Sequence, residues 1–221
     1  MRSSLARCAV ASFAAILLLT PSILAFDSPL SSEAVREAYF LGQRHDDIGR
    51  YLDAYTKVLA QPETGPYISS VQFLTPFAQL IQLSSQHSTG YSAQQAEQEH
   101  RKQPETVTIV IEIQLTESYG ELLPQPPASR SGSGTGYRLR SPEFWRDFET
   151  QVWQGEKEIE PARLHGEPNY ACSENGRCSM TGATLWLHFP AKAFESDAAT
   201  IAITPPVGDP VAVEFDLSRL R

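Results

Sequence analysis

Residues 107–115 read Val-Thr-Ile-Val-Ile-Glu-Ile-Gln-Leu, and this stretch decides the class of fold. Apolar side chains recur at every second position, and Thr108, Glu112 and Gln114 are among the residues between them. An alternation with a period of two places the apolar side chains on one face of a β-strand. The stretch therefore predicts a long strand with one face in a hydrophobic core.

Shorter segments of the same kind follow along the chain. Apolar residues alternate with other residues at 148–153, 183–189, 201–203 and 211–217, and turn-forming segments separate them. Roughly six to eight short strands between turns are typical of an antiparallel β-sandwich, and they are compatible with an immunoglobulin-like arrangement. We therefore expect residues 104–221 to form a β-sandwich domain.

The preceding residues, 26–103, have a helical pattern. One helix is expected before Gly42, because glycine tolerates the left-handed conformation at a helix C-terminus. A second helix is expected over 48–59, capped by Asp46 or Asp47. Its apolar residues follow helical spacing and would form one stripe: Ile48, Tyr51, Leu52, Tyr55 and Leu59.

Two more helix starts and one strand are expected within this region. Residues 67–74 predict a short strand. Thr75-Pro76 has the form of a helix start, with threonine as the cap and proline at the first helical position, although a strand is also compatible there. Ser92-Ala93-Gln94-Gln95 has the form of a capping box. The sequence thus predicts an α+β protein, either a helical region beside a sandwich or one fused unit.

Residues 1–25 have the order of a secretory signal peptide. Arg2 and Arg7 precede an almost wholly apolar run at Ala9–Leu19, and cleavage is expected after Ala25. An uncleaved membrane anchor is the alternative, but the apolar run is short for a membrane span. We therefore expect an exported protein, periplasmic or extracellular, with no membrane span after cleavage.

Cleavage would leave two cysteines, Cys172 and Cys178. In an oxidising compartment an isolated pair of this kind predicts a disulfide. The residues Glu174-Asn175-Gly176 between them suit a type I turn with Gly176 in the left-handed conformation. We expect a bridge at the tip of a hairpin. A metal site would need more soft ligands, and a redox switch would favour a C-x-x-C spacing.

Residues 117–136 are expected to form a mobile loop. They contain Pro124-Gln125-Pro126-Pro127 followed by a run rich in serine and glycine, which buries little apolar surface. Gly132, Gly134 and Gly136 are not followed by the lysine and helix start of a phosphate-binding loop. A linker-like loop is therefore the favoured interpretation.

The balance of charge disfavours some partners. Without residues 1–25 the chain has 16 basic residues, two fewer than the 18 of the whole, and keeps all 26 acidic ones. We therefore expect neither a nucleic-acid footprint nor a polybasic membrane patch. Only four of the 18 basic residues are lysine, which fits a GC-rich bacterial genome.

The tryptophans are the most suggestive binding residues. Trp186 and His188 alternate with leucines in their strand, so they face outward if the leucines face the core. Trp153 has a similar position in an earlier strand. Exposed aromatic rings stack on sugars or anchor protein partners. The candidate ligand-binding residues are therefore Trp186, Trp153 and His188, and burial of the tryptophans in the core is the alternative.

No sequence motif indicates catalysis. The chain has no G-x-S-x-G, S-x-x-K or H-E-x-x-H pattern, and His45-Asp46-Asp47 is explained by helix capping as readily as by a metal. We expect no catalytic residue, cofactor or metal ligand. The first hypothesis is a non-catalytic envelope protein that acts as an interaction or structural module for an unknown envelope protein. The second is a carbohydrate-binding module for a polysaccharide, and a secreted hydrolase is third.

Overall fold

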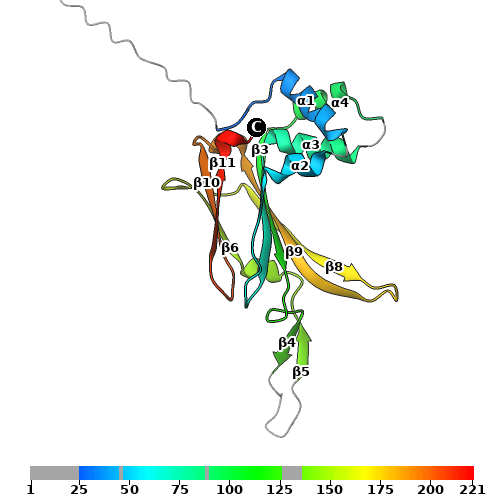
Figure 1. The fold of residues 1–221 in the computed structure, drawn as a ribbon, viewed down its shortest axis with the longest axis vertical. Coiled ribbons are helices and arrows are strands. Elements are labelled where there is room, and N and C mark those ends of the chain that lie inside the picture. The colour runs from blue at the N-terminus through cyan, green and yellow to red at the C-terminus, as the bar shows by residue number, and fades with distance from the viewer. Residues whose placement is uncertain (1–24, 45–46, 88–89, 126–135) are drawn as a thin grey trace, which may run out of the picture.

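The computed structural model describes residues 25–44, 47–87, 90–125 and 136–221 (Figure 1). It is an α+β fold, with N-terminal helices and several antiparallel sheets. The predicted export signal lies almost entirely outside the described residues. The helices are α1 (Ser32–Gly42), α2 (Ile48–Asp53), α3 (Pro76–Gln86) and α4 (Ala93–His100).

The strands form two larger sheets and one hairpin. The first sheet has the order β1 (Thr56–Val58), β2 (Tyr67–Leu74), β3 (Thr106–Gln114), β9 (Cys178–Pro190) and β8 (Arg163–Cys172). The second has the order β11 (Val211–Asp216), β10 (Ala198–Thr204), β6 (Glu149–Gln154) and β7 (Lys157–Glu158). The hairpin pairs β4 (Leu122–Gln125) with β5 (Gly136–Leu139). Every pairing is antiparallel.

The strand expected at 107–115 is confirmed as β3, the central strand of the five-stranded sheet. Its isoleucines are fully buried in a core that also receives side chains from the four-stranded sheet. Phe73 of β2 and Phe215 of β11 contact each other across this core, with ring centroids 5.6 Å apart. Side chains of both sheets therefore belong to one hydrophobic core.

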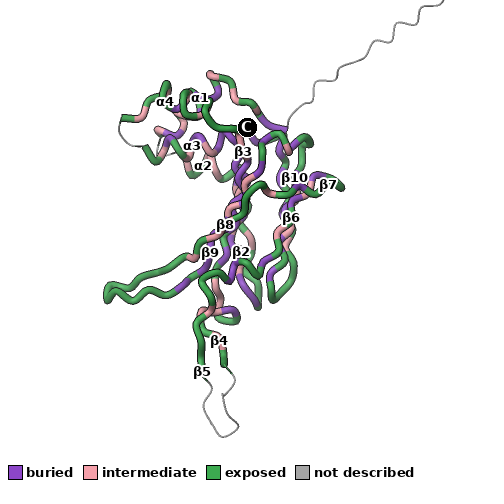
Figure 2. The backbone as a smooth tube through the Cα atoms, turned by 180° about the vertical axis from the view of Figure 1, so that it is seen from behind, coloured by how far each residue is buried: buried purple, intermediate pink, exposed green. Residues whose placement is uncertain are grey.

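The outer face of β3 is covered over half its length. Thr108 and Val110 are buried, although the alternation places them on the face away from the core. The helices lie over this end of the sheet, whereas Glu112 and Gln114 further along are exposed (Figures 1 and 2). The alternation predicts that the whole outer face of β3 is exposed. The structure differs because the helices cover half of that face.

The expected helix over 48–59 is wrong in its second half. α2 ends at Asp53, and the three residues of β1 pair with β2 at the edge of the sheet. The apolar spacing there is compatible with a helix, but the free edge of β2 supplies backbone partners that an isolated helix turn lacks. The side chain of Asp47 forms an ion pair with Arg50, at 3.1 Å, rather than a cap. His45 and Asp46 lie outside the described residues.

The expected boundary at 103/104 runs through the five-stranded sheet. β1 and β2 come from the segment expected to be helical, and they pair with β3 from the expected sandwich. The expected stop before Gly42 is wrong, because α1 includes Gly42, which has no left-handed conformation, and the C-cap of the helix is Gln43. Two other local predictions for this segment are confirmed. α3 begins at Pro76 with a side-chain cap from Thr75, and α4 has both hydrogen bonds of the capping box at Ser92.

Part of the loop expected at 117–136 is a hairpin instead. β4 and β5 pair over four residues each, with Leu122 opposite Leu139 and Pro124 opposite Tyr137. The sequence pattern does not predict this pairing, because each strand has only four residues and the segment is rich in proline. The rest of the expected loop, 126–135, lies outside the described residues.

The disulfide between Cys172 and Cys178 is confirmed. The two residues lie opposite each other at the end of the β8–β9 hairpin, next to a Ser173 N–H that donates to the Arg177 carbonyl at 2.8 Å. Gly176 has the predicted left-handed conformation, with φ of 75°. The residues around the bridge are exposed, so it fastens the tip of a projecting hairpin rather than the core.

Replacing the bridge with serines, as Cys172→Ser/Cys178→Ser, should cost little stability. Closing so short a loop contributes at most about 2 kcal/mol of chain entropy. We expect the midpoint of thermal unfolding to fall by roughly 4–8 °C or less for a protein of this size. Loss of the cooperative transition in calorimetry would show instead that the bridge supports the core.

Candidate functional site

Trp186 and His188 lie where the alternation places them, on the outer face of β9. Both are partly buried, and both lie between fully buried neighbours such as Leu187. Trp153 is also partly buried but belongs to β6 of the other sheet, where it pairs with Thr200 of β10. The structure therefore brings Trp186 and His188 together and leaves Trp153 apart from them.

The strand register places Trp186 in a row of side chains across the five-stranded sheet. Gln72 of β2 is opposite Val110 of β3, which is opposite Trp186, and Trp186 is opposite His165 of β8. The His165 ring stacks on Trp186 with centroids 4.9 Å apart and on His188 with centroids 5.4 Å apart. Three parallel rings thus form a rigid platform on the outer face.

His188 is held within this platform by a hydrogen bond between its Nδ1 and the Thr108 hydroxyl, at 3.1 Å. Burial lowers the pKa of His188, and the nearby His165 and Arg163 lower it further. The imidazole is therefore neutral at neutral pH. A neutral His188 imidazole adds no positive charge to this face, so it favours contacts with uncharged ligand surface over binding of anions.

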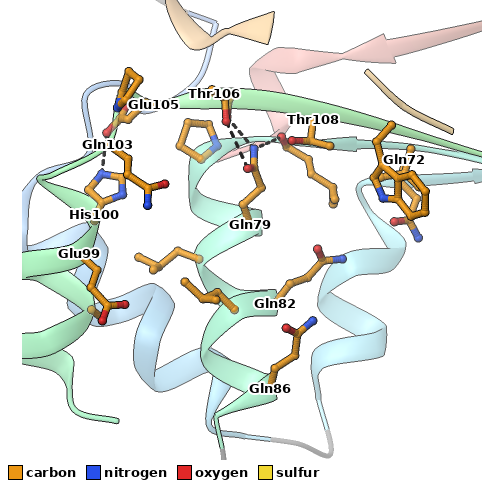
Figure 3. Close-up of a pocket in the computed structure, with 18 of the residues that line it drawn as sticks. Gln72, Gln79, Gln82, Gln86, Glu99, His100, Gln103, Glu105, Thr106 and Thr108 are labelled. Carbon is orange, nitrogen blue, oxygen red and sulfur yellow. Dashed lines mark hydrogen bonds and ion pairs between the residues drawn. The ribbon is translucent and has the colours of Figure 1, made fainter. Parts of the chain in front are cut away.

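A groove of about 570 Å³ begins at Trp186 and runs between the sheet and the helices (Figure 3). Its floor is the outer face of β2, β3 and β9, and its walls are α3 on one side and α4 with the following segment on the other. The volume lies within the range of about 300–1,000 Å³ that is usual for ligand pockets. This groove is the candidate functional site.

The α3 wall presents amides. Gln79, Gln82 and Gln86 are spaced so that they share one helix face, and the three line the groove (Figure 3). The opposite face of α3 is apolar and packs against α1. This packing is close, since a Cβ at Gly42 of α1 would lie 2.5 Å from the Ile81 carbonyl oxygen. The glutamines are thereby held on a fixed helix.

Gln79 is tied to the sheet, but most of the other glutamines are free to meet a ligand. The Gln79 side chain donates to the carbonyl of Thr106 at 2.6 Å and to that of Leu74 at 3.0 Å. No side-chain hydrogen bond within the described part of the chain engages the remaining glutamines of the groove: Gln72, Gln82, Gln86 and Gln103. Each carries a donor and an acceptor.

The other wall depends on Glu105, the residue before β3. Its carboxylate accepts hydrogen bonds from the Ser28 hydroxyl and the Leu30 N–H, both at 2.6 Å. It also contacts His100 Nε2 of α4 at 2.8 Å. One side chain therefore joins α4, the segment before α1 and the start of β3.

The balance of forces on Glu105 favours its ionised form. Burial raises its pKa, but the hydrogen bonds from His100, Ser28 and Leu30 lower it by more, so the pKa lies below its ordinary value of 4.5. Both oxygens of the Glu105 carboxylate form hydrogen bonds, and these bonds fix the position of this wall of the groove. Glu99 and Glu112 also line the groove and are exposed.

Sequence reasoning missed this groove, although one signal for it exists. Residues 76–86 form a helix without a single charged side chain, and its polar face consists of amides and serines. Exposed faces of helices usually carry charged residues. The position of that face over the β2–β3–β9 row was not available from the sequence.

The described ranges contain no cluster of three or more His, Cys, Asp or Glu side chains that could hold a metal ion. Within the same ranges, none of the helices has the length and apolar character needed to cross a bilayer. The disulfide is typical of an oxidising compartment. No protein-family model matches the chain, and a comparison with curated proteins finds no significant match.

Replacing Glu105 with glutamine should destabilise the protein in a pH-dependent way. Because the folded-state pKa is lowered, the stabilisation is present above about pH 4.5 and is lost as the pH falls through the folded-state value. We expect Glu105→Gln to lower the free energy of unfolding by about 1–3 kcal/mol at pH 7, since an amide cannot accept all the hydrogen bonds.

The difference from the wild type should shrink in acid. Urea unfolding between pH 3 and pH 7 would measure this trend. Glu99→Gln is the matched control, because Glu99 is exposed on the same wall and should have little effect. A constant difference across the pH range would contradict the assignment.

Proposed function

We propose that this protein is an exported, non-catalytic binding protein of the cell envelope, and that its groove takes an uncharged oligosaccharide chain. The observation that carries the proposal is the combination of an aromatic platform at Trp186 with unengaged amides along one groove. Sugar hydroxyls both donate and accept hydrogen bonds, and the apolar faces of sugar rings pack on aromatic side chains.

The charges around the groove favour a neutral ligand. Glu99, Glu105 and Glu112 line it, and its only basic side chain among the lining residues is His100, which already contacts Glu105. An anionic polysaccharide would meet carboxylates without compensating cations. A neutral polysaccharide meets amides, threonine hydroxyls and an indole instead.

The proposal treats the two main sheets as the layers of a β-sandwich. Their shared core and the contact between Phe73 and Phe215 support this interpretation. In a sandwich the inner faces of both sheets are buried in the core, so a ligand can reach only the outer faces. The helices cover one end of one outer face and so convert a flat sheet surface into a groove.

Export to the periplasm or the cell exterior is part of the same proposal. The order of residues 1–25 and the disulfide both support it. Neutral polysaccharides are encountered in those compartments. An envelope location also agrees with an interaction role that needs no catalytic group.

The Trp186→Ala substitution should lower affinity for a bound glycan by about tenfold or more, equivalent to roughly 1.4 kcal/mol. The reason is that the sugar loses its aromatic platform. Soluble oligosaccharides from cellulose, xylan, mannan and chitin would first be screened by thermal shift. Isothermal titration calorimetry would then compare the variants on the glycan that binds.

Trp153→Ala is the matched control, because Trp153 is also partly buried on a strand but belongs to the other sheet. It should bind as the wild type does, and Trp186→Phe should recover part of the affinity. The proposal fails if no neutral glycan binds, or if Trp186→Ala binds as tightly as the wild type.

A further inference from the structure

The outer face of the five-stranded sheet has a second cavity beside the groove. Its volume is about 530 Å³, and Glu112 lines both cavities. Gln114 of β3, Asn169 of β8 and Gly182 of β9 also line the second cavity. The register places these three residues in one row across the sheet, because Gly182 is opposite Gln114 on one side and opposite Asn169 on the other. The second cavity therefore lies over the half of the face that the helices leave open.

The two cavities follow the same pair of strands. The groove contacts β3 from Thr106 to Glu112, and the second cavity contacts it from Glu112 to Gln114. On β9 the groove contacts Thr184, and the second cavity contacts Gly182, the next residue on the same face. Because a strand rises about 3.4 Å per residue, β3 is roughly 27 Å long from Thr106 to Gln114. The groove and the second cavity thus form one elongated track along β3 and β9.

The floor of the second cavity has no side chain at Gly182. A Cβ at this position would collide with the Ile113 carbonyl oxygen and lie 3.1 Å from the Gln114 Cα, so only glycine fits. The β8–β9 register also shifts here, between Asn169 and Tyr170. Glycine inside a strand marks a bulge or the close approach of another backbone, and both occur at this place. The missing side chain leaves a hollow between Gln114 and Asn169.

The polar side chains around the second cavity include two amides and a carboxylate. Glu112 and Gln114 are exposed, and neither side chain has a hydrogen bond or ion pair with another described residue. The Asn169 amide donates to the Thr184 hydroxyl at 3.0 Å, which fixes it at the edge of the cavity. None of the described residues that line the second cavity is basic. It therefore offers unengaged hydrogen-bonding groups and no positive charge.

We propose that a glycan bound in the groove continues past Glu112 into the second cavity, so that the protein binds linear neutral chains along their length. This inference rests on the proposed function. The Gln114 amide donates to and accepts from sugar hydroxyls, and the Glu112 carboxylate accepts from hydroxyls where the two cavities meet. A chain already held at Trp186 has lost its translational freedom, so each further contact adds affinity at little extra entropic cost.

An extended peptide fits this track less well. β3 pairs with β2 on one side and with β9 on the other, and β9 pairs with β8. The backbone groups that would bind a peptide as an added strand are therefore already used within the sheet. Side chains alone remain to contact the ligand. Amides, a carboxylate and hydroxyls suit a ligand that carries many hydroxyl groups.

The test compares chain lengths of the glycan that binds in the thermal-shift screen, from the disaccharide to the octasaccharide. Isothermal titration calorimetry would use processed protein purified after expression of the full chain with its own leader. We expect the dissociation constant to fall by about tenfold or more from the short to the long oligosaccharides. It should then become constant, because longer chains extend beyond both cavities.

Gln114→Ala should weaken binding of the long oligosaccharides by about two- to tenfold, through loss of hydrogen bonds in the second cavity. Binding of the disaccharide should not change, because the shortest ligand stays beside Trp186. Gln151→Ala is the matched control, since Gln151 is an exposed glutamine on β6 of the other sheet. It should bind every oligosaccharide as the wild type does. Both substitutions are exposed and should leave the circular dichroism spectrum unchanged.

The extended site and the proposed function fail in different ways. If no neutral glycan of any length binds, both are overturned. If short and long oligosaccharides bind equally tightly, the extended site is overturned and the groove remains the binding site. The same holds if Gln114→Ala binds the long oligosaccharides as tightly as the wild type, or weakens short and long ones alike.

Discussion

The carboxylate of Glu105 is the interaction on which the groove depends. Glu105 directly precedes the central strand β3. Three short contacts join its carboxylate to the segment before α1 and to helix α4. Gln79 makes the corresponding connection from α3 to the carbonyl of Thr106, the next residue along. Two adjacent positions at the start of β3 thus hold both walls of the groove over the sheet.

This arrangement explains why the outer face of β3 has two halves. Near Glu105 the helices cover the strand, and Thr108 and Val110 are buried beneath them. Further along, the face is open and carries Glu112. Trp186 lies between these regions on the neighbouring strand, partly buried and lining the groove. An aromatic ring in that position is rigid because it stacks on His165, yet it remains available to a ligand.

The groove and the β4–β5 hairpin occupy different parts of the molecule. The groove lies between the helices and the outer face of β2, β3 and β9. The β4–β5 hairpin projects from the end of the molecule opposite the helices (Figure 1).

Some features followed directly from local chemistry. The alternation at 107–115, the cap at Thr75, the capping box at Ser92 and the bridge from Cys172 to Cys178 are confirmed. Each depends on residues close together in the chain, where spacing alone decides which groups meet. The position of Trp186 and His188 on the same face of their strand followed for the same reason.

Other features depend on contacts between distant segments. Residues 56–58 fit a helical stripe by spacing, but they form a strand because β2 offers its free edge. The groove joins β2, β3 and β9 with two helices, and the separation of Trp153 from Trp186 depends on which sheet each strand enters. The sequence by itself determined the strand at 107–115, the caps at Thr75 and Ser92 and the disulfide, because these are local. Only the tertiary structure decided the groove, because long-range strand pairing and helix packing determine which faces are covered.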